Sequence, residues 1–207
     1  MDEKDFLKKD NNLIIITSIT PIKNKKYEVI LSDGEALELN EDMMVEYRIY
    51  KGKELTLDLA AEIEERIQFF DAYSKALSYA TTYFKCSKEI SDYLLKKGYS
   101  KDISDEVSNA LLEKKVIDDD NYLSIYVSKL TKDGNGRLMI SHKIYEKGLK
   151  NDYTIDEELY FDVLSKLTKK KLKTIKDKKK ERLYRYLSSK GYTIEDINKA
   201  LKGVSIE

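Results

Sequence analysis

Three lysine–glycine pairs of the chain, those ending at Gly98, Gly148 and Gly191, follow the same apolar pattern. Isoleucine or leucine stands eight and four positions before each glycine, and lysine stands immediately before it. This apolar spacing marks one face of a helix, and the glycine predicts a helix end in the left-handed conformation. The tyrosine or leucine that follows each glycine is then expected to pack back on the last turn.

The three glycines lie 50 and 43 residues apart, which is the interval of a repeated multi-helix unit that stacks on its neighbours. We therefore expect a mostly α protein whose three tandem three-helix repeats form an elongated, curved stack, preceded by a small β-hairpin and helix module. The expected ranges are 1–70 for the module and 71–117, 118–164 and 165–207 for the repeats.

The N-terminal module is predicted from β-branched residues at 13–22, which indicate a strand, and from alternating apolar residues on both sides of Asp33-Gly34. A two-residue loop would place Val29 opposite Glu38. A loop of odd length would place Val29 opposite Leu39, and we prefer it because one face then stays apolar. Asn40 is expected to cap a short helix, and a longer helix is expected to open near Thr56.

The composition favours long helices, because a chain with 37% charged residues and one proline has few residues that end helices or favour turns. The single cysteine, Cys86, excludes an internal disulfide framework and fits a reducing compartment. No signal peptide is recognisable, and the longest apolar run, residues 13–16, is too short to cross a bilayer. We expect a soluble, cytoplasmic protein.

Charge is unevenly distributed although 38 basic and 38 acidic residues balance. Residues 33–71 hold twelve acids and four bases, whereas residues 166–190 hold twelve bases and two acids. The run at 169–185 could lie on a helix against DNA phosphates or an acidic groove of a protein filament. The alternative is a solvated helix face that serves only solubility.

Other polar groups offer weaker candidates. The three aspartates at 118–120 are expected to cap a helix rather than hold a metal. Tyr122 and Tyr126 could stack on bases, but core packing is the preferred interpretation. His142 lacks a second histidine or a nucleophile, and the glycines at 134 and 136 lack the GK[ST] sequel of a phosphate loop. We expect no catalytic residue, no metal and no cofactor.

The order of these signals resembles the regulatory protein RecX family, in its longer form with an N-terminal hairpin module. The resemblance covers nearly the whole chain and rests on the ordered series of motifs rather than on any one of them. The segments that carry it are Ala76 to Tyr83, Ser87-Lys88-Glu89-Ile90, Leu94 to Tyr99, Ile117-Asp118-Asp119-Asp120-Asn121-Tyr122, Lys132 to Arg137, and Glu146 to Leu149.

The resemblance implies a non-enzymatic regulator of DNA repair, homologous recombination and the SOS response. Members of the family bind the RecA filament on DNA, lie along its groove and depress its ATPase, strand-exchange and coprotease activities. We expect a monomer that binds this filament. Direct binding to DNA is a further option. One alternative is a helical-repeat protein that binds nucleic acid without RecA, although the neutral overall charge argues against it. The other is a scaffold for another protein.

The residues expected to contact the partner or DNA are the bases of the C-terminal run and one arginine of the second repeat. They are Arg137, Lys169, Lys170, Lys171, Lys173, Lys176, Lys178, Lys179, Lys180, Arg182 and Arg185.

Overall fold

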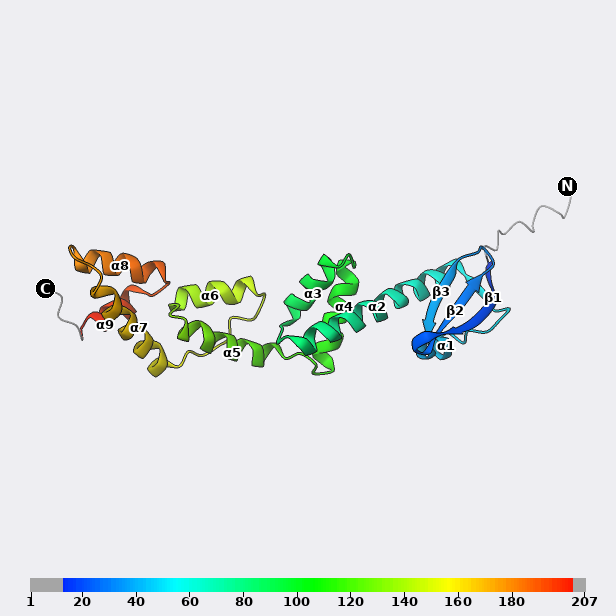
Figure 1. Cartoon of the computed structure of the whole chain (residues 1–207), viewed down its shortest axis with the longest axis horizontal. Coiled ribbons are helices and arrows are strands. Elements are labelled where there is room, and N and C mark those ends of the chain that lie inside the picture. Colours follow the sequence, from blue (N-terminus) through cyan, green and yellow to red (C-terminus); the bar gives the residue numbers. More distant parts are fainter. Residues whose placement is uncertain (1–12, 203–207) are drawn as a thin grey trace, which may run out of the picture. The chain divides into compact units, whose positions relative to one another are not determined.

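The computed structural model describes residues 13–202 of the chain, so residues 1–12 of the expected module and 203–207 of the third repeat lie outside the described residues. The described chain forms two compact units, divided within one long helix between Lys75 and Ala76. The first holds a small antiparallel sheet and the second is helical (Figure 1). The prediction of a mostly helical repeat protein with an N-terminal β module is confirmed.

The sheet of the first unit contains four antiparallel strands in the order β3-β2-β1-β4. Its inward side chains, which include Ile16, Leu39 and Leu55, are almost completely buried and pack with Met43 and Ile63 from the helices. The elements of the first unit are β1 (Leu13–Ile22), the 3-10 turn η1 (Lys23–Lys25), β2 (Lys26–Leu31), β3 (Ala36–Asn40), α1 (Glu41–Glu46) and β4 (Glu54–Thr56).

The hairpin between β2 and β3 has a loop of odd length, as expected, but the predicted pairing is wrong by two residues. Val29 lies opposite Leu37 rather than Leu39. The N–H of Leu31 donates to the carbonyl of Glu35 at 2.8 Å, which closes a three-residue loop with Gly34 at φ +93°. The shorter loop preserves the parity of the pairing, so the apolar face is kept.

Two features complete the first unit. The Asn40 side chain accepts a hydrogen bond of 2.8 Å from the Met43 N–H, which confirms the predicted cap of α1. Residues Glu54–Thr56, expected to lead straight into a helix, first pair with β1 as β4. The long helix α2 (Leu57–Thr82) begins directly after this strand and continues into the second unit.

The second unit repeats one backbone arrangement at the three lysine–glycine pairs. Its helices after α2 are α3 (Ser87–Lys96), α4 (Lys101–Glu113), α5 (Asp119–Lys132), α6 (Arg137–Glu146), α7 (Glu157–Leu172), α8 (Lys179–Ser189) and α9 (Ile194–Leu201). Helices α3, α6 and α8 each have lysine as the C-cap residue, followed by glycine with φ of +94°, +66° and +84°.

The same two hydrogen bonds close all three helix ends, in the pattern of a Schellman motif. Tyr99, Leu149 and Tyr192 each donate their N–H to the carbonyl five residues earlier, at 3.2–3.3 Å. The glycine N–H donates to the carbonyl three residues earlier in each case. The apolar residues eight and four positions before each glycine are 0% exposed. The repeat read from the sequence is therefore also a repeat of structure.

Helix α7 differs from expectation because it serves two neighbouring repeats. The expected ranges require one helix that closes the second repeat by residue 164 and a separate helix that opens the third repeat from residue 165. Instead, residues 147–156 form no helix, and Asp156 caps one helix that continues to Leu172. This helix contacts α5 as well as α8 and α9. The expected boundary at 164/165 thus falls inside α7.

Candidate functional site

The lysine-rich run at 169–185 does not form one helix. Lys169, Lys170 and Lys171 lie in the last turn of α7, residues 173–178 form a connection without helix, and the remaining bases lie on α8. Lysines so close in sequence repel one another along a single helix face, and the connection spreads them over three segments. The run is therefore a surface made from two helix ends and the connection between them.

Apolar residues within the run hold this surface to the third repeat. Ile175 and Leu183 are 7% and 0% exposed, and Leu172 and Tyr184 are partly buried against the same core. The bases between them point outward, since all but Lys171 and Lys179 are exposed. The interleaved apolar side chains are thus core residues of the third repeat and leave only the cations for a partner.

Some cations of the run already have partners. Arg182 forms a salt bridge of 3.0 Å with Asp177, Arg185 forms one of 2.9 Å with Glu181, and the Lys171 amine lies 4.9 Å from the centre of the Tyr186 ring. Within the described residues no salt bridge involves the other seven. These seven, named here the free lysines, are Lys169, Lys170, Lys173, Lys176, Lys178, Lys179 and Lys180.

Arg137, the predicted partner contact outside this run, has a different environment. Its guanidinium binds both carboxylate oxygens of Glu157, at 2.7 and 2.8 Å, and lies 3.4 Å from a carboxylate oxygen of Asp196. It also covers the ring of Tyr160 at 4.6 Å. The Glu157 hydrogen bonds raise the pKa of Arg137. Arg137 therefore joins the second repeat to the third.

The acidic partner of this arginine is buried. Asp196 is 4% exposed and accepts a hydrogen bond of 2.8 Å from the Tyr160 hydroxyl, which itself accepts one of 3.2 Å from the Arg137 N–H. Burial works against the charged carboxylate, but hydrogen bonds from Tyr160 and Thr193 and the charge of Arg137 outweigh it, so the pKa of Asp196 lies below its usual value. Burial raises the pKa of Tyr160.

A second polar cluster joins the first repeat to the second. Lys147 donates a hydrogen bond of 2.7 Å to Glu89, and the Lys85 amine lies 3.6 Å from the same carboxylate. Burial works against the charged form of Glu89, but the Lys147 hydrogen bond and the Cys86 N–H outweigh it and lower the pKa of Glu89. Burial likewise works against charge on Lys147, whose pKa is raised by its bond to Glu89.

Ser87 connects two repeats rather than capping α3. The cap position belongs to Cys86, and Ser87 is the first helical residue. The Ser87 N–H donates to Asp119 at 2.8 Å, and its hydroxyl donates to the same carboxylate. Sequence reasoning missed this contact because nothing local distinguishes a serine that caps its own helix from one that binds the next repeat.

The two junctions between repeats are built in the same way. The first residue of the second helix binds the first residue of the following repeat: Ser87 binds Asp119, and Arg137 binds Glu157. The cap residue just before that helix lies on the next lysine–glycine pair. Cys86 Sγ is 4.0 Å from the Lys147 carbonyl, and the Gly136 N–H donates to the Lys190 carbonyl at 2.8 Å.

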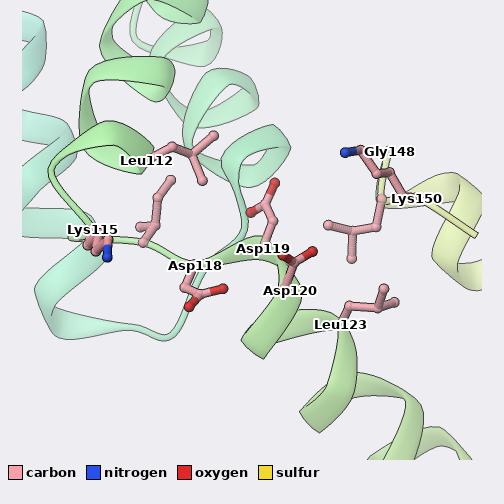
Figure 2. A pocket seen from close by; sticks show the side chains of 10 residues that line it. Leu112, Lys115, Asp118, Asp119, Asp120, Leu123, Gly148 and Lys150 are labelled. Atoms are coloured by element: carbon pink, nitrogen blue, oxygen red, sulfur yellow. The ribbon is translucent and has the colours of Figure 1, made fainter. Parts of the chain in front are cut away.

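A pocket of about 490 Å³ lies beside the first junction (Figure 2). Its lining combines apolar side chains, such as Leu112 and Leu123, with the aspartates at 118–120. Asp118 caps α5 by accepting from the Asn121 N–H at 2.8 Å, as predicted, and Asp119 binds Ser87. Within residues 13–202 no group of three or more His, Cys, Asp or Glu side chains is placed to hold a metal ion.

The remaining candidates have structural surroundings. Tyr122 is 7% exposed and stacks on Phe84 with ring centres 5.3 Å apart, whereas Tyr126 is half-buried beside the core of the second repeat. His142 lies 3.5 Å from Glu146 on the exposed side of α6. Across residues 13–202, no helix combines the length and the apolar character needed to span a bilayer.

Fold and junctions together define a helical-repeat protein with a small N-terminal sheet. Comparison with known proteins makes the class more specific. A family model described as "RecX, third three-helix domain" matches residues 157–201, which begin with α7. The chain is 30% identical to the regulatory protein RecX of Clostridium acetobutylicum, over 93% of this chain and 97% of that protein. The chain therefore belongs to the RecX family.

Other relatives agree. The regulatory protein RecX of Bacillus subtilis is 28% identical over 93% of this chain and 78% of its own length. A crystal structure of regulatory protein RecX matches with a TM-score of 0.72 at 21% identity, covering 89% of this chain and 97% of that one, which supports the fold. These relatives are named regulatory proteins, and the chain is accordingly a RecX-type regulator.

Proposed function

We propose that this chain binds the RecA filament assembled on DNA and lowers its ATPase, strand-exchange and coprotease activities. The observation that carries the proposal is the match to regulatory RecX proteins along nearly the whole chain. The protein would act as a monomer in the cytoplasm. Its effect on RecA would regulate homologous recombination and the SOS response.

The free lysines supply a physical basis for filament binding. Seven cations without salt bridges on one repeat produce a positive surface that attracts DNA phosphates or an acidic protein groove. Binding shifts RecA only if the chain binds one filament state more tightly than another. The proposed regulator therefore prefers an inactive or dissociating arrangement of the filament and binds it through the bases at 169–185.

The proposed effect on ATP hydrolysis is exerted through RecA rather than by a site on this chain. The loop with Gly134 and Gly136 is the candidate phosphate cradle, but the Gly136 N–H is already bonded to the Lys190 carbonyl. A Cβ added at Gly136 would lie 2.2 Å from the Gly191 carbonyl carbon, so this glycine serves close packing between repeats. We accordingly propose a regulator without catalytic residues or cofactors.

The test is the single-strand-dependent ATPase rate of RecA with and without the protein. A variant with Lys173→Gln, Lys176→Gln and Lys178→Gln is compared with a matched variant carrying Lys23→Gln, Lys25→Gln and Lys51→Gln in the first unit. We expect the wild type and the matched variant to lower the rate, and the first variant to do so only at about tenfold higher concentration. An unchanged ATPase rate at stoichiometric wild-type protein contradicts the proposal.

The free lysines also favour a second function, direct binding of nucleic acid without RecA. A titration of bare single-stranded DNA against RecA-coated DNA separates the two. Equal affinity for both, with the same salt dependence, would support the second function.

A further inference from the structure

Each internal junction uses a lysine–glycine pair as a receptor for a helix N-terminus. The N-terminus of α3 lies on Lys147-Gly148, where a Cβ added to the glycine would be 2.8 Å from Lys88 Cδ. The N-terminus of α6 lies on Lys190-Gly191, where an added Cβ would be 2.5 Å from the Met139 nitrogen. At Gly191 glycine is required by the close backbone approach as well as by its positive φ, whereas at Gly148 the positive φ requires it and the Lys88 side chain can move.

The pair of the first repeat has the same backbone geometry but no such helix on it. Gly98 is exposed, and an added Cβ would meet nothing within 4 Å. Lys97 is exposed as well, with its amine 5.6 Å from the centre of the Tyr93 ring. Within the described part of the second unit, the surface that two repeats use for their neighbours is therefore vacant at Lys97-Gly98.

We propose that Lys97-Gly98 is a docking site for the N-terminus of a helix from a partner protein. The internal junctions specify its chemistry. The residue before the partner helix must be small, like Cys86 and Gly136, because it lies on the lysine carbonyl. Its first turn should carry a carboxylate that pairs with Lys97, as Glu89 pairs with Lys147 at 2.7 Å. Resting on the proposed function, the partner is a protomer of the RecA filament.

A second copy of this chain fits the site poorly. Within residues 13–202, the second-helix N-terminus that no following repeat covers is that of α8, in the third repeat. It presents Lys178, Lys179 and Lys180, which would face Lys96 and Lys97 of the other copy, and its first-turn carboxylate, Glu181, is already paired with Arg185 at 2.9 Å. Like charges at this separation repel, so the charge pattern selects a partner with an acidic helix start.

The test combines two substitutions at the site with two matched controls. Gly98→Asn adds a side chain to the open surface, and asparagine tolerates a positive φ at small cost. Lys97→Glu reverses the charge that the carboxylate would meet. The controls are Gly52→Asn, at another open glycine with φ +89°, and Lys129→Glu, at an exposed lysine in the last turn of α5. Affinity for RecA filaments on single-stranded DNA is measured for all five proteins.

We expect Gly98→Asn and Lys97→Glu to weaken filament binding by about tenfold or more, and the controls to change it by less than about twofold. Filament binding by all five proteins with equal affinity overturns the docking site and leaves the proposed function standing.

A second arm does not depend on RecA. A capped peptide copying residues 84–97, with serine in place of the cysteine, supplies the N-terminus of α3 as a probe for the full-length protein labelled with nitrogen-15. The amide resonances of residues 97–99 should shift in the wild type and not in the Gly98→Asn variant. If they do, the docking site stands even where filament binding fails. Absence of shifts at millimolar peptide, or self-association that Lys179→Glu abolishes, overturns the proposal.

Discussion

The side chains of Glu89 and Lys147 form a hydrogen-bonded ion pair of 2.7 Å across 58 residues of sequence. In the next junction Met139 occupies the position of Glu89, and the contact is made by backbone instead. There the N–H groups of Gly136 and Leu138 donate to the carbonyls of Lys190 and Gly191 at 2.8 and 3.0 Å. At the lysine–glycine pair itself, the first junction thus uses an ion pair and the second a close backbone approach.

The junction that contains Glu89 and Lys147 should weaken in acid. The pKa of Glu89 is lowered in the folded state, so its contribution to stability is present above the unfolded pKa and is lost as the pH falls through the folded one. Glu89→Gln should lower the free energy of unfolding by about 1 kcal/mol at pH 7, and by less at pH 3, where protonation weakens the same interaction in the wild type. Urea denaturation at both pH values measures this difference. Glu113→Gln, at an exposed position, is the control, and an equal loss for Glu89→Gln at both pH values would contradict the assignment.

Arg137 should matter more for stability than other surface arginines. Arg137→Ala leaves buried Asp196 without its cation, for which we expect a loss of about 2–3 kcal/mol in the free energy of unfolding. Arg137→Lys keeps the charge but has a single nitrogen, whereas arginine binds Glu157 through Nη2 and Asp196 through Nε, so an intermediate loss is expected. The control is Arg185→Ala, which removes an exposed ion pair and should cost less than about 0.5 kcal/mol. Equal losses for Arg137→Ala and Arg185→Ala would refute the junction role.

Gly136→Ala tests the close approach between the second and third repeats. The φ of Gly136 is −79°, which alanine adopts freely, so any loss comes from the Cβ against the Gly191 backbone. We expect about 1–3 kcal/mol of destabilisation, together with faster hydrogen exchange at the Leu138 amide. In Gly34→Ala the only penalty is the positive φ, about 1–2 kcal/mol, and exchange at Leu138 should be unchanged. Wild-type exchange at Leu138 in Gly136→Ala would show that the approach tolerates a methyl group.

The Cys86 thiol should be unreactive in the folded protein. Its side chain is completely buried, and burial raises its pKa to about 11, so little thiolate exists at neutral pH. Reaction with an aromatic disulfide reagent should be slower than that of the urea-unfolded chain by about a hundredfold or more. Equal rates before and after unfolding would mean that the thiol is accessible.

The sequence predicts those parts of the fold that depend on neighbouring residues. The Schellman ends after α3, α6 and α8 follow from an apolar residue, a lysine and a glycine at fixed spacing, and the cap at Asn40 follows from its side chain and the acids after it. The strand β4 was missed because three residues carry no period. The register of the β2–β3 hairpin was wrong because two odd loops keep the same face apolar and only backbone closure distinguishes them.

The junctions were beyond local reasoning. Ser87 and Asp119 are 32 residues apart, and Arg137 and Asp196 are 59 apart, so no window of sequence contains either pair. A signal was nevertheless present: the lysine before each glycine and the acid that opens α5 and α7 recur in register with the repeat. Their role could have been suspected by asking which polar residues recur together with the apolar ones.

Helix α7 has a consequence for how such chains change in length. It contacts α5 of the second repeat as well as α8 and α9 of the third, so it belongs to the packing of both repeats. A truncation before Glu157 would remove the third repeat. It would also remove a helix that packs against α5 of the second repeat. Gene duplication or protein engineering would have to cut within this helix, or copy both neighbours together, to yield a shorter or longer chain that still folds.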